Sequence, residues 1–284
     1  MNKRNLQKLL KNLHFTPQKR EGQTFLTDNN VRNKIISFAQ IKKDEIILEV
    51  GAGLGALTEE LVKHAREVIA YEQDPTLFAY LTKKFKKYMN IELLNQDVLK
   101  TELPPHDKVV SNLPFSATGE LLEKLFFRKA ASPGILMIEK KLADRIFPSE
   151  NYKDFSRLTV SVNAFMTPIE RFMVSRNSFY PRPKIDISVI KLTPKESLNP
   201  FLATEEGRDF FLQFIGGIFP YKNKNIVNAL QLFMKNFSSR TPQKDELTSH
   251  LKAMGLSNQK LFQFSGAQFI DLAQMMQDIL AQNT

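Results

Sequence analysis

The sequence predicts an α/β domain with a largely parallel, doubly wound sheet, followed by a small all-helical domain. From about residue 45, short β-rich runs alternate with amphipathic helical stretches in the order strand, loop, helix. After Pro194 this alternation stops, and helices rich in Phe, Leu and Met follow without a convincing strand. We therefore expect a first domain over residues 1–195 and a second over residues 196–284.

The alternation divides the first domain into a series of short elements. EIILEV at residues 45–50 is the first β-rich run, and it breaks into a glycine loop followed by a helix. Two late strands, residues 169–174 and 185–192, flank the rigid turn Tyr180-Pro181-Arg182-Pro183 and are expected to form a hairpin at the sheet edge. The other expected strands are residues 67–72, 91–94, 108–112 and 134–138, and the expected helices are residues 56–64, 75–87, 118–128 and 139–147.

Composition excludes several classes of protein. The chain has 284 residues with 42% hydrophobic content, which is enough for one large core and an appended smaller domain. No apolar run approaches the roughly 18 to 20 residues needed to span a bilayer, and no secretory signal is evident, so we expect a cytoplasmic protein without membrane association. The absence of cysteine excludes disulfides and thiolate zinc sites, and the four histidines lack metal-ligand spacing. We expect no metal, and a monomer.

The net charge of +10 lies entirely in the first domain, because acidic and basic residues balance after residue 195. A basic cluster at the N-terminus precedes the first acid, Glu21. It contains Lys3, Arg4, Lys8, Lys11, Lys19 and Arg20. Such a cluster favours binding of a polyanion, although a solvated tail has the same composition. Leucines at helical spacing in this segment also resemble an organellar transit peptide; they are Leu6, Leu9, Leu10 and Leu13.

A glycine loop follows the first expected strand. Gly51, Gly53 and Gly55 allow the backbone to turn sharply and approach a ligand, with a helix N-terminus behind them. Such loops serve nicotinamide, flavin and sulfonium cofactors alike. Glu72 closes the second strand about 20 residues later, where a carboxylate can hold both ribose hydroxyls of an adenine nucleoside. Asp97, just beyond the third strand, can accept from the adenine amino group of S-adenosylmethionine, although a lone Asp in a loop is also a common turn former.

The tetrapeptide Asn112-Leu113-Pro114-Phe115 ends the fourth expected strand and predicts methylation of a planar exocyclic nitrogen. Such an amine is a poor nucleophile because its lone pair is delocalised into the ring. If the Asn112 side-chain oxygen and the Pro114 carbonyl accept its two N–H bonds, the nitrogen is held in place and its lone pair points at the methyl group. Phe115 would stack on a base taken out of its helix.

These motifs closely resemble those of the ribosomal RNA adenine dimethyltransferase family. The resemblance covers nearly the whole chain and rests on residues 22–26 (GQTFL), 49–58 (EVGAGLGALT), 155–158 (FSRL) and 179–185 (FYPRPKI). It implies a Rossmann-like class I S-adenosylmethionine methyltransferase domain with a small C-terminal all-α domain that binds RNA or the ribosome. It also implies that the target is a pair of adjacent adenosines in a hairpin loop near the 3′ end of small-subunit rRNA.

The resemblance also assigns site residues. Gln23, Thr24 and Leu26 would close over the cofactor, Gly51 and Gly53 would face its methionine part, Glu72 its ribose and Asp97 its adenine, while Asn112 would touch cofactor and target. The stretch from Phe219 to Leu230, with Lys222 and Lys224, aligns with a more arginine-rich family segment and is expected to contact RNA. Two residues depart from the family pattern. Thr24 stands where the family usually has Asn, so a hydroxyl takes the place of the amide. Phe115 replaces the commoner Tyr and keeps the stacking face.

Three other functions remain open. An erythromycin-resistance methylase would use the same chemistry on large-subunit rRNA, whereas the turn at residues 180–183 and the near-neutral second domain favour the small-subunit enzyme. A non-catalytic RNA-binding assembly factor would keep the fold without turnover, which the presence of Asn112, Glu72 and Asp97 disfavours. A DNA adenine methylase is disfavoured by the resemblance outside the tetrapeptide.

Overall fold

The protein is described by a computed structural model that covers residues 3–18, 23–147, 155–236, 243–256 and 258–281. Lys19, Arg20 and Gly22, which belong to the N-terminal basic cluster and the first motif, lie outside these residues. The chain forms two compact units. The first comprises Met1–Phe126, Ala131–Ala143 and Thr167–Pro194, and the second comprises Phe127–Ala130, Asp144–Met166 and Lys195–Thr284.

The second unit therefore differs from the expected domain of residues 196–284. Its longest segment begins at Lys195, but it also takes two earlier segments of the chain. Helix α7 (Arg157–Phe165) lies in one of these segments and packs against α9 (Glu205–Ile218) and α12 (Gly266–Ala281). No helix was expected over these residues, and local sequence patterns do not show which core a helix joins, so the predicted division near residue 195 did not include the two earlier segments.

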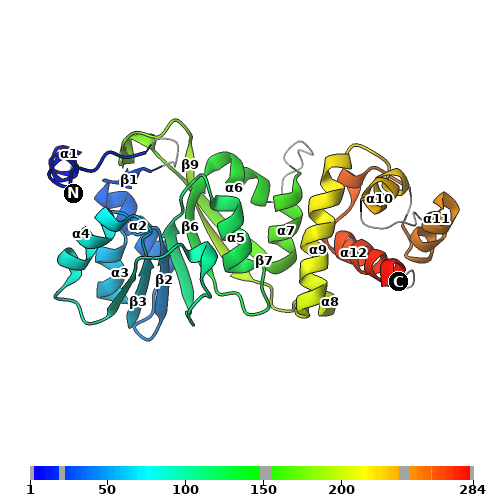
Figure 1. Cartoon of the computed structure of the whole chain (residues 1–284), viewed down its shortest axis with the longest axis horizontal. Helices are drawn as coiled ribbons and strands as arrows, with labels where there is room; N and C mark the ends of the chain where they lie inside the picture. The colour runs from blue at the N-terminus through cyan, green and yellow to red at the C-terminus, as the bar shows by residue number, and fades with distance from the viewer. Residues whose placement is uncertain (1–2, 19–22, 148–154, 237–242, 257, 282–284) are drawn as a thin grey trace. The chain divides into compact units, whose positions relative to one another are not determined.

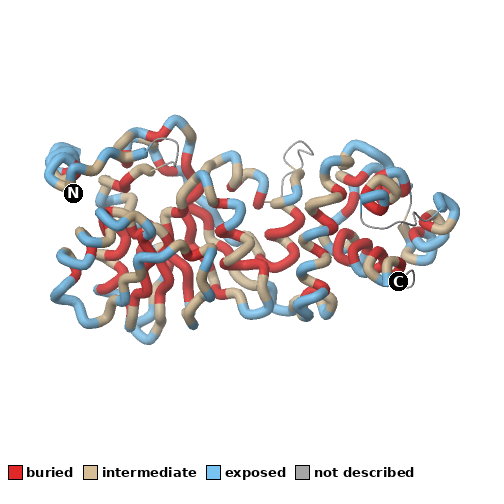
Figure 2. The backbone as a smooth tube through the Cα atoms, viewed as in Figure 1, coloured by how far each residue is buried: buried red, intermediate tan, exposed pale blue. Residues whose placement is uncertain are grey.

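A seven-stranded sheet forms the centre of the first unit, in the order β4-β3-β2-β5-β6-β9-β7. The first five strands along this order pair in parallel, and β9 pairs antiparallel with β6. Their buried residues form the core that runs through the sheet in Figure 2. The strands are β2 (Ile46–Val50), β3 (Glu67–Tyr71), β4 (Ile91–Leu94), β5 (Lys108–Asn112), β6 (Gly134–Glu139), β7 (Met166–Val174) and β9 (Ile187–Pro194). The doubly wound α/β fold and the late antiparallel strands are confirmed.

Helices connect the parallel strands and lie along the sheet (Figure 1). Asp28 and Asp74 are N-cap residues: each side chain accepts two backbone N–H bonds from the first turn of the following helix, α2 or α4. Helix α2 was not among the expected elements, because the alternation of strands and helices that predicted the others begins only at about residue 45. The helices of the first unit are α1 (Lys3–Asn12), α2 (Asn29–Ala39), α3 (Thr58–His64), α4 (Pro75–Phe85) and α5 (Thr118–Phe126), with 3-10 turns η2 (Val98–Lys100) and η4 (Arg176–Ser178). The boundary between the units falls inside α6 (Lys140–Ile146), after Ala143.

A separate two-stranded ribbon joins the N-terminal motif to the late segment of the same unit. β1 (Phe25–Leu26) pairs antiparallel with β8 (Phe179–Tyr180). Thr27 donates its N–H and its hydroxyl to the Ser178 carbonyl, at 2.8 and 3.0 Å. Thr27 and Ser178 are 151 positions apart in sequence, so these contacts hold the N-terminal motif against a distant part of the chain.

The second unit is helical where the structure describes it, as expected. Its core is rich in phenylalanine, and Phe211, Phe214, Phe233 and Phe269 are all fully buried. The ammonium group of Lys222 donates to the Phe155 carbonyl at 3.2 Å, so this lysine is tied to its own unit. Besides α7, α9 and α12, the unit contains α8 (Pro200–Ala203), η5 (Phe219–Tyr221), α10 (Ile226–Met234), α11 (Lys244–Ala253) and η6 (Leu261–Gln263). In neither unit does a described helix have the length and apolarity that crossing a membrane requires.

Candidate active site

The glycine loop turns immediately after β2. Gly51, Gly53 and Gly55 all have positive φ angles, of 74°, 59° and 73°. The N–H groups of Gly51 and Ala52 donate to the Tyr71 carbonyl at 2.8 and 3.0 Å, which anchors the loop to the end of β3. Because side chains are strained at such φ values, the glycines are required for this turn.

Glu72 braces this loop from the end of β3. One carboxylate oxygen accepts the Gly53 N–H at 2.7 Å, and the other accepts the Asp74 N–H at 2.9 Å. Only 6% of the residue is exposed. Burial raises the pKa of the Glu72 carboxyl, although the N–H bonds of Asp74 and Gly53 oppose this shift. Glu72 therefore connects the loop to the N-terminus of α4.

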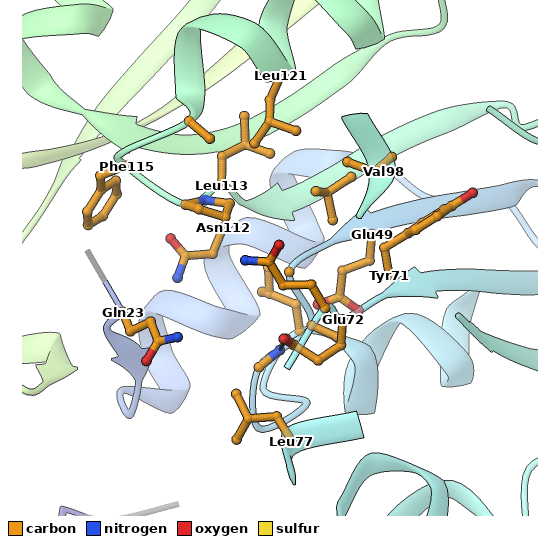
Figure 3. A pocket seen from close by; sticks show the side chains of 18 of the residues that line it. Gln23, Glu49, Tyr71, Glu72, Leu77, Val98, Asn112, Leu113, Phe115 and Leu121 are labelled. Atoms are coloured by element: carbon orange, nitrogen blue, oxygen red, sulfur yellow. Dashed lines mark hydrogen bonds between the residues drawn. The ribbon is translucent and has the colours of Figure 1, made fainter. Parts of the chain in front are cut away.

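The loop opens into a cavity of about 360 Å³ at the carboxyl ends of the parallel strands. Its volume is typical of a site for a small molecule or cofactor. In Figure 3 the side chains of Phe115 and Asn112 lie above that of Gln23, which comes from the N-terminal segment, and all three line the cavity. All ten residues expected at the site line this cavity: Gln23, Thr24, Leu26, Gly51, Gly53, Glu72, Asp97, Asn112, Pro114 and Phe115.

Asn112 has a hydrogen bond on only one side of its amide. Its Nδ2 donates to the Thr24 carbonyl at 3.4 Å, which orients the amide and leaves Oδ1 as the acceptor on the other side. Asn112 Oδ1 and Thr24 Oγ1 are both buried and have no hydrogen-bond partner within the described parts of the chain. Because buried polar atoms are normally satisfied, two such atoms in one cavity indicate that a polar ligand belongs there.

The Pro114 carbonyl does not have the free position expected for it. It accepts the Ala117 N–H at 3.1 Å and the Thr118 hydroxyl at 3.0 Å, at the start of α5. A carbonyl oxygen has two lone pairs, so these two donors use its capacity. The Pro114 ring instead packs 3.5 Å from the position that a Cβ on Gly51 would occupy. Pro114 thus shapes the cavity, and the carbonyl that was expected to accept the amine already has two donors within the chain.

Asp97 and Gln23 have structural partners in addition to their place in the cavity. Asp97 accepts the Leu99 N–H at 3.1 Å and lies 3.6 Å from the Lys100 ammonium, so it also forms the turn that its position in a loop favours. Gln23 accepts the Gln18 N–H at 2.9 Å through its side-chain oxygen. Both side chains are therefore oriented before a ligand enters.

Glu49 also lines the cavity, although it was not among the expected site residues. It is 2% exposed and accepts the Thr58 hydroxyl at 2.6 Å. Burial raises the pKa of its carboxyl to about 7, with a smaller contribution from the nearby Glu72 charge. An acid inside the apolar run EIILEV is the sequence signal that could have identified it.

The chain is similar in sequence to proteins that modify ribosomal RNA. Residues 14–265 match the family model for ribosomal RNA adenine dimethylase. The chain is 38% identical over 229 residues to the "Probable ribosomal RNA small subunit methyltransferase A" of Methanosarcina barkeri, which covers 81% of this chain and 77% of that protein.

Two solved structures resemble this chain. A dimethyladenosine transferase from Plasmodium falciparum superposes with a TM-score of 0.72 at 28% identity, covering 87% of this chain and 95% of that chain. The 23S rRNA methyltransferase ErmE superposes with a TM-score of 0.61 at 24% identity, covering 89% and 99%. At that identity, the second likeness concerns the fold alone.

Proposed function

Because the chain belongs to the ribosomal RNA adenine dimethylase family, we propose that it methylates N6 of two adjacent adenosines in small-subunit rRNA with S-adenosylmethionine, giving N6,N6-dimethyladenosine. The target is a hairpin loop near the 3′ end of the rRNA, and the modification takes place on an assembling, pre-30S-like subunit in the cytoplasm. The observation that carries this proposal is the buried Asn112 Oδ1, which has no partner among the described residues and lies in a cavity that Glu72 and the glycine loop help to line.

The cavity residues fit S-adenosylmethionine part by part. The positive-φ turns at Gly51 and Gly53 bring backbone against the methionine part. Glu72 is the carboxylate for the ribose hydroxyls, and its hydrogen bonds to the loop fix its orientation. Asp97 accepts from the adenine amine, and Thr24 Oγ1 supplies the remaining polar contact from the N-terminal segment. Gln23 and Leu26 close this side of the cavity. When bound, the cofactor supplies an electrophilic methyl group on a sulfonium.

The target amine is held at the end of β5. Asn112 Oδ1 accepts one N–H of the adenine amine, because the Asn112 Nδ2 is already directed to the Thr24 carbonyl. The Leu113 carbonyl, which belongs to the next residue along the cavity wall, accepts the second N–H in place of the engaged Pro114 carbonyl. Two acceptors favour the pyramidal form of the nitrogen and direct its lone pair at the methyl group.

Phe115 provides the face on which the flipped adenine stacks. It lies at the border of the cavity, directly after the residues that hold the amine (Figure 3). Stacking needs the ring and not a hydroxyl, so the replacement of Tyr by Phe keeps this function. A strong general base is not required, because the amine proton becomes acidic only as the new bond forms. Orientation therefore supplies most of the catalysis.

The test is transfer of tritium from labelled S-adenosylmethionine to unmethylated small ribosomal subunits, with large subunits in parallel, followed by nucleoside analysis of the digested RNA. Dimethyladenosine from small subunits alone is the expected result. Label in large subunits would instead identify the erythromycin-resistance activity. Binding of S-adenosylmethionine without transfer to either subunit would overturn the enzymatic proposal in favour of a non-catalytic assembly factor.

A further inference from the structure

The N-terminal helix α1 packs its leucine face against the wall of the cofactor cavity. Leu6 and Leu10 are 1% and 4% exposed, and they form one cluster with Phe25, Leu54 and Leu77. The last three residues also line the cavity, from the N-terminal motif, the glycine loop and the first turn of α4. The same side chains therefore contact α1 on one side and border the cavity on the other.

Aromatic contacts extend this connection to the glycine loop itself. Phe15, just after α1, packs edge-on against Phe25 with ring centroids 6.2 Å apart. The Phe25 ring lies 3.3 Å from the position of a Cβ on Gly53. Gly53 in turn donates its N–H to Glu72. The position of α1 is thus connected by direct contacts to the residues that we assign to the cofactor.

The exposed surface of α1 is strongly basic. Lys3, Arg4, Lys8 and Lys11 are all exposed, and none of them forms an ion pair with an acid that the structure describes. The first turn contains no acid. Cations at a helix N-terminus oppose the helix dipole, so Lys3 and Arg4 do not stabilise the helix. Exposed cations grouped in this way suit a ligand of opposite charge.

We propose that α1 binds phosphates of the RNA substrate through Lys3, Arg4, Lys8 and Lys11 while its leucine face holds the cofactor cavity closed. RNA binding on one face then stabilises the docked helix, and the docked helix stabilises the cavity. Because such coupling is reciprocal, RNA tightens cofactor binding and cofactor tightens RNA binding by the same factor. The identity of the RNA rests on the proposed function, whereas the role of α1 does not require methyl transfer.

The first experiment measures RNA affinity against salt. The variant Lys3→Gln/Arg4→Gln/Lys8→Gln/Lys11→Gln is titrated with a fluorescein-labelled RNA hairpin from the 3′ end of the small-subunit rRNA, over a series of KCl concentrations. We expect the Kd to rise at least about tenfold at low salt. The slope of log K against log salt should fall by about 3, since each lost phosphate contact removes about 0.7 to 0.9.

A matched control neutralises the same charge elsewhere on the first unit. Lys42→Gln/Lys83→Gln/Lys86→Gln/Lys87→Gln removes four exposed lysines that precede β2 and β4, at the opposite edge of the sheet from the cavity. This variant should bind the hairpin within about twofold of wild type. Equal Kd values and slopes for the two variants would overturn the proposal.

The second experiment tests the coupling to the cofactor. Binding of S-adenosylhomocysteine is measured by calorimetry with and without the hairpin, in wild type and in Leu6→Ala/Leu10→Ala. RNA should tighten S-adenosylhomocysteine binding several-fold in wild type and not in the leucine variant, whose thermal midpoint reports whether the domain is folded. RNA tightening in a folded leucine variant would overturn the coupling. A wild type that binds RNA in this way but methylates no subunit would contradict the proposed function and not the role of α1.

Discussion

The Glu72 carboxylate accepts the backbone N–H of Gly53 at 2.7 Å, across 19 positions of sequence. The residue proposed to hold the cofactor ribose therefore also fixes the loop that faces the methionine part. Its other oxygen accepts the Asp74 N–H at 2.9 Å, so both ends of the carboxylate are engaged by the fold. Cofactor recognition and loop geometry depend on the same side chain.

Glu72→Gln should weaken cofactor binding by about 5- to 150-fold. An amide has one oxygen, so either the Gly53 N–H or the Asp74 N–H loses its acceptor, and an unsatisfied buried donor costs about 1–3 kcal/mol. Calorimetric titration with S-adenosylhomocysteine measures the effect. Glu67→Gln, at the other end of β3, is the matched control and should bind like wild type. An unchanged Kd in Glu72→Gln would refute the bracing role.

Glu49 should make stability fall as pH rises. Burial raises the pKa of its carboxyl from 4.5 to about 7, so the folded protein retains a proton that the unfolded chain releases. The stabilisation is complete below pH 4.5 and is lost as pH rises through about 7. Glu49→Gln keeps an acceptor for Thr58 and removes this dependence, at about 1.4 kcal/mol per pKa unit, or about 3 kcal/mol in all. Urea unfolding of wild type and Glu49→Gln at pH 5 and pH 8 measures this dependence. If stability changes with pH in the same way in both proteins, the pKa of Glu49 is not raised by burial.

The sequence predicted the position of those site residues that lie at or just after the end of a parallel strand. Gly51, Glu72 and Asn112 could be placed together because the carboxyl ends of parallel strands lie at one edge of a sheet. The helix that begins at Thr118 was expected, but the bonds that Ala117 and Thr118 donate to the Pro114 carbonyl depend on the exact path of the chain between the strand and the helix, which sequence patterns do not specify. The other contacts in the site depend on long-range packing, which local sequence patterns do not specify.

The β1–β8 ribbon and the docking of α1 also depend on long-range contacts, so local sequence patterns did not predict them. The ribbon between Phe25 and Tyr180 has strands of two residues, which is too short for any periodicity. The leucine spacing of α1 indicated a helix, but its docking against Leu54 and Leu77 depends on a tertiary contact that sequence spacing does not specify.

Gly53→Ala should reduce cofactor affinity by at least about tenfold. At φ 59° an alanine is strained by about 1–2 kcal/mol, and its Cβ would lie 3.3 Å from the Phe25 ring on the cavity wall. Gly119→Ala is the control: it lies in α5, no heavy atom lies within 4 Å of its Cβ position, and alanine favours the helix. Titration with S-adenosylhomocysteine compares the two. Equal affinities would show that the loop tolerates the side chain.

Phe115→Tyr should retain methyl transfer, whereas Phe115→Ala should lose about 5- to 150-fold in kcat/KM for the RNA. Loss of base stacking costs about 1–3 kcal/mol, and the tyrosine ring preserves the stacking face. Cofactor affinity should change little in either variant, because the ring lies at the border of the cavity. Single-turnover transfer to small subunits measures the effect. Full activity in Phe115→Ala would exclude stacking on this residue.

Asn112→Ala should abolish methyl transfer, with a loss of at least about a hundredfold in kcat, while cofactor affinity is only partly weakened. The variant removes Oδ1, the acceptor proposed for the target amine, and also the Nδ2 bond to the Thr24 carbonyl. Removing one oriented hydrogen-bonding group of this kind typically costs a hundredfold or more. Asn33→Ala, on the exposed face of α2, is the control and should behave as wild type. Because Thr24 belongs to the segment that closes over the cofactor, a parallel loss of cofactor binding and turnover would indicate that Asn112 acts by holding that segment. Loss of turnover at saturating cofactor would indicate that it acts on the amine, and unchanged turnover would remove Asn112 from the mechanism.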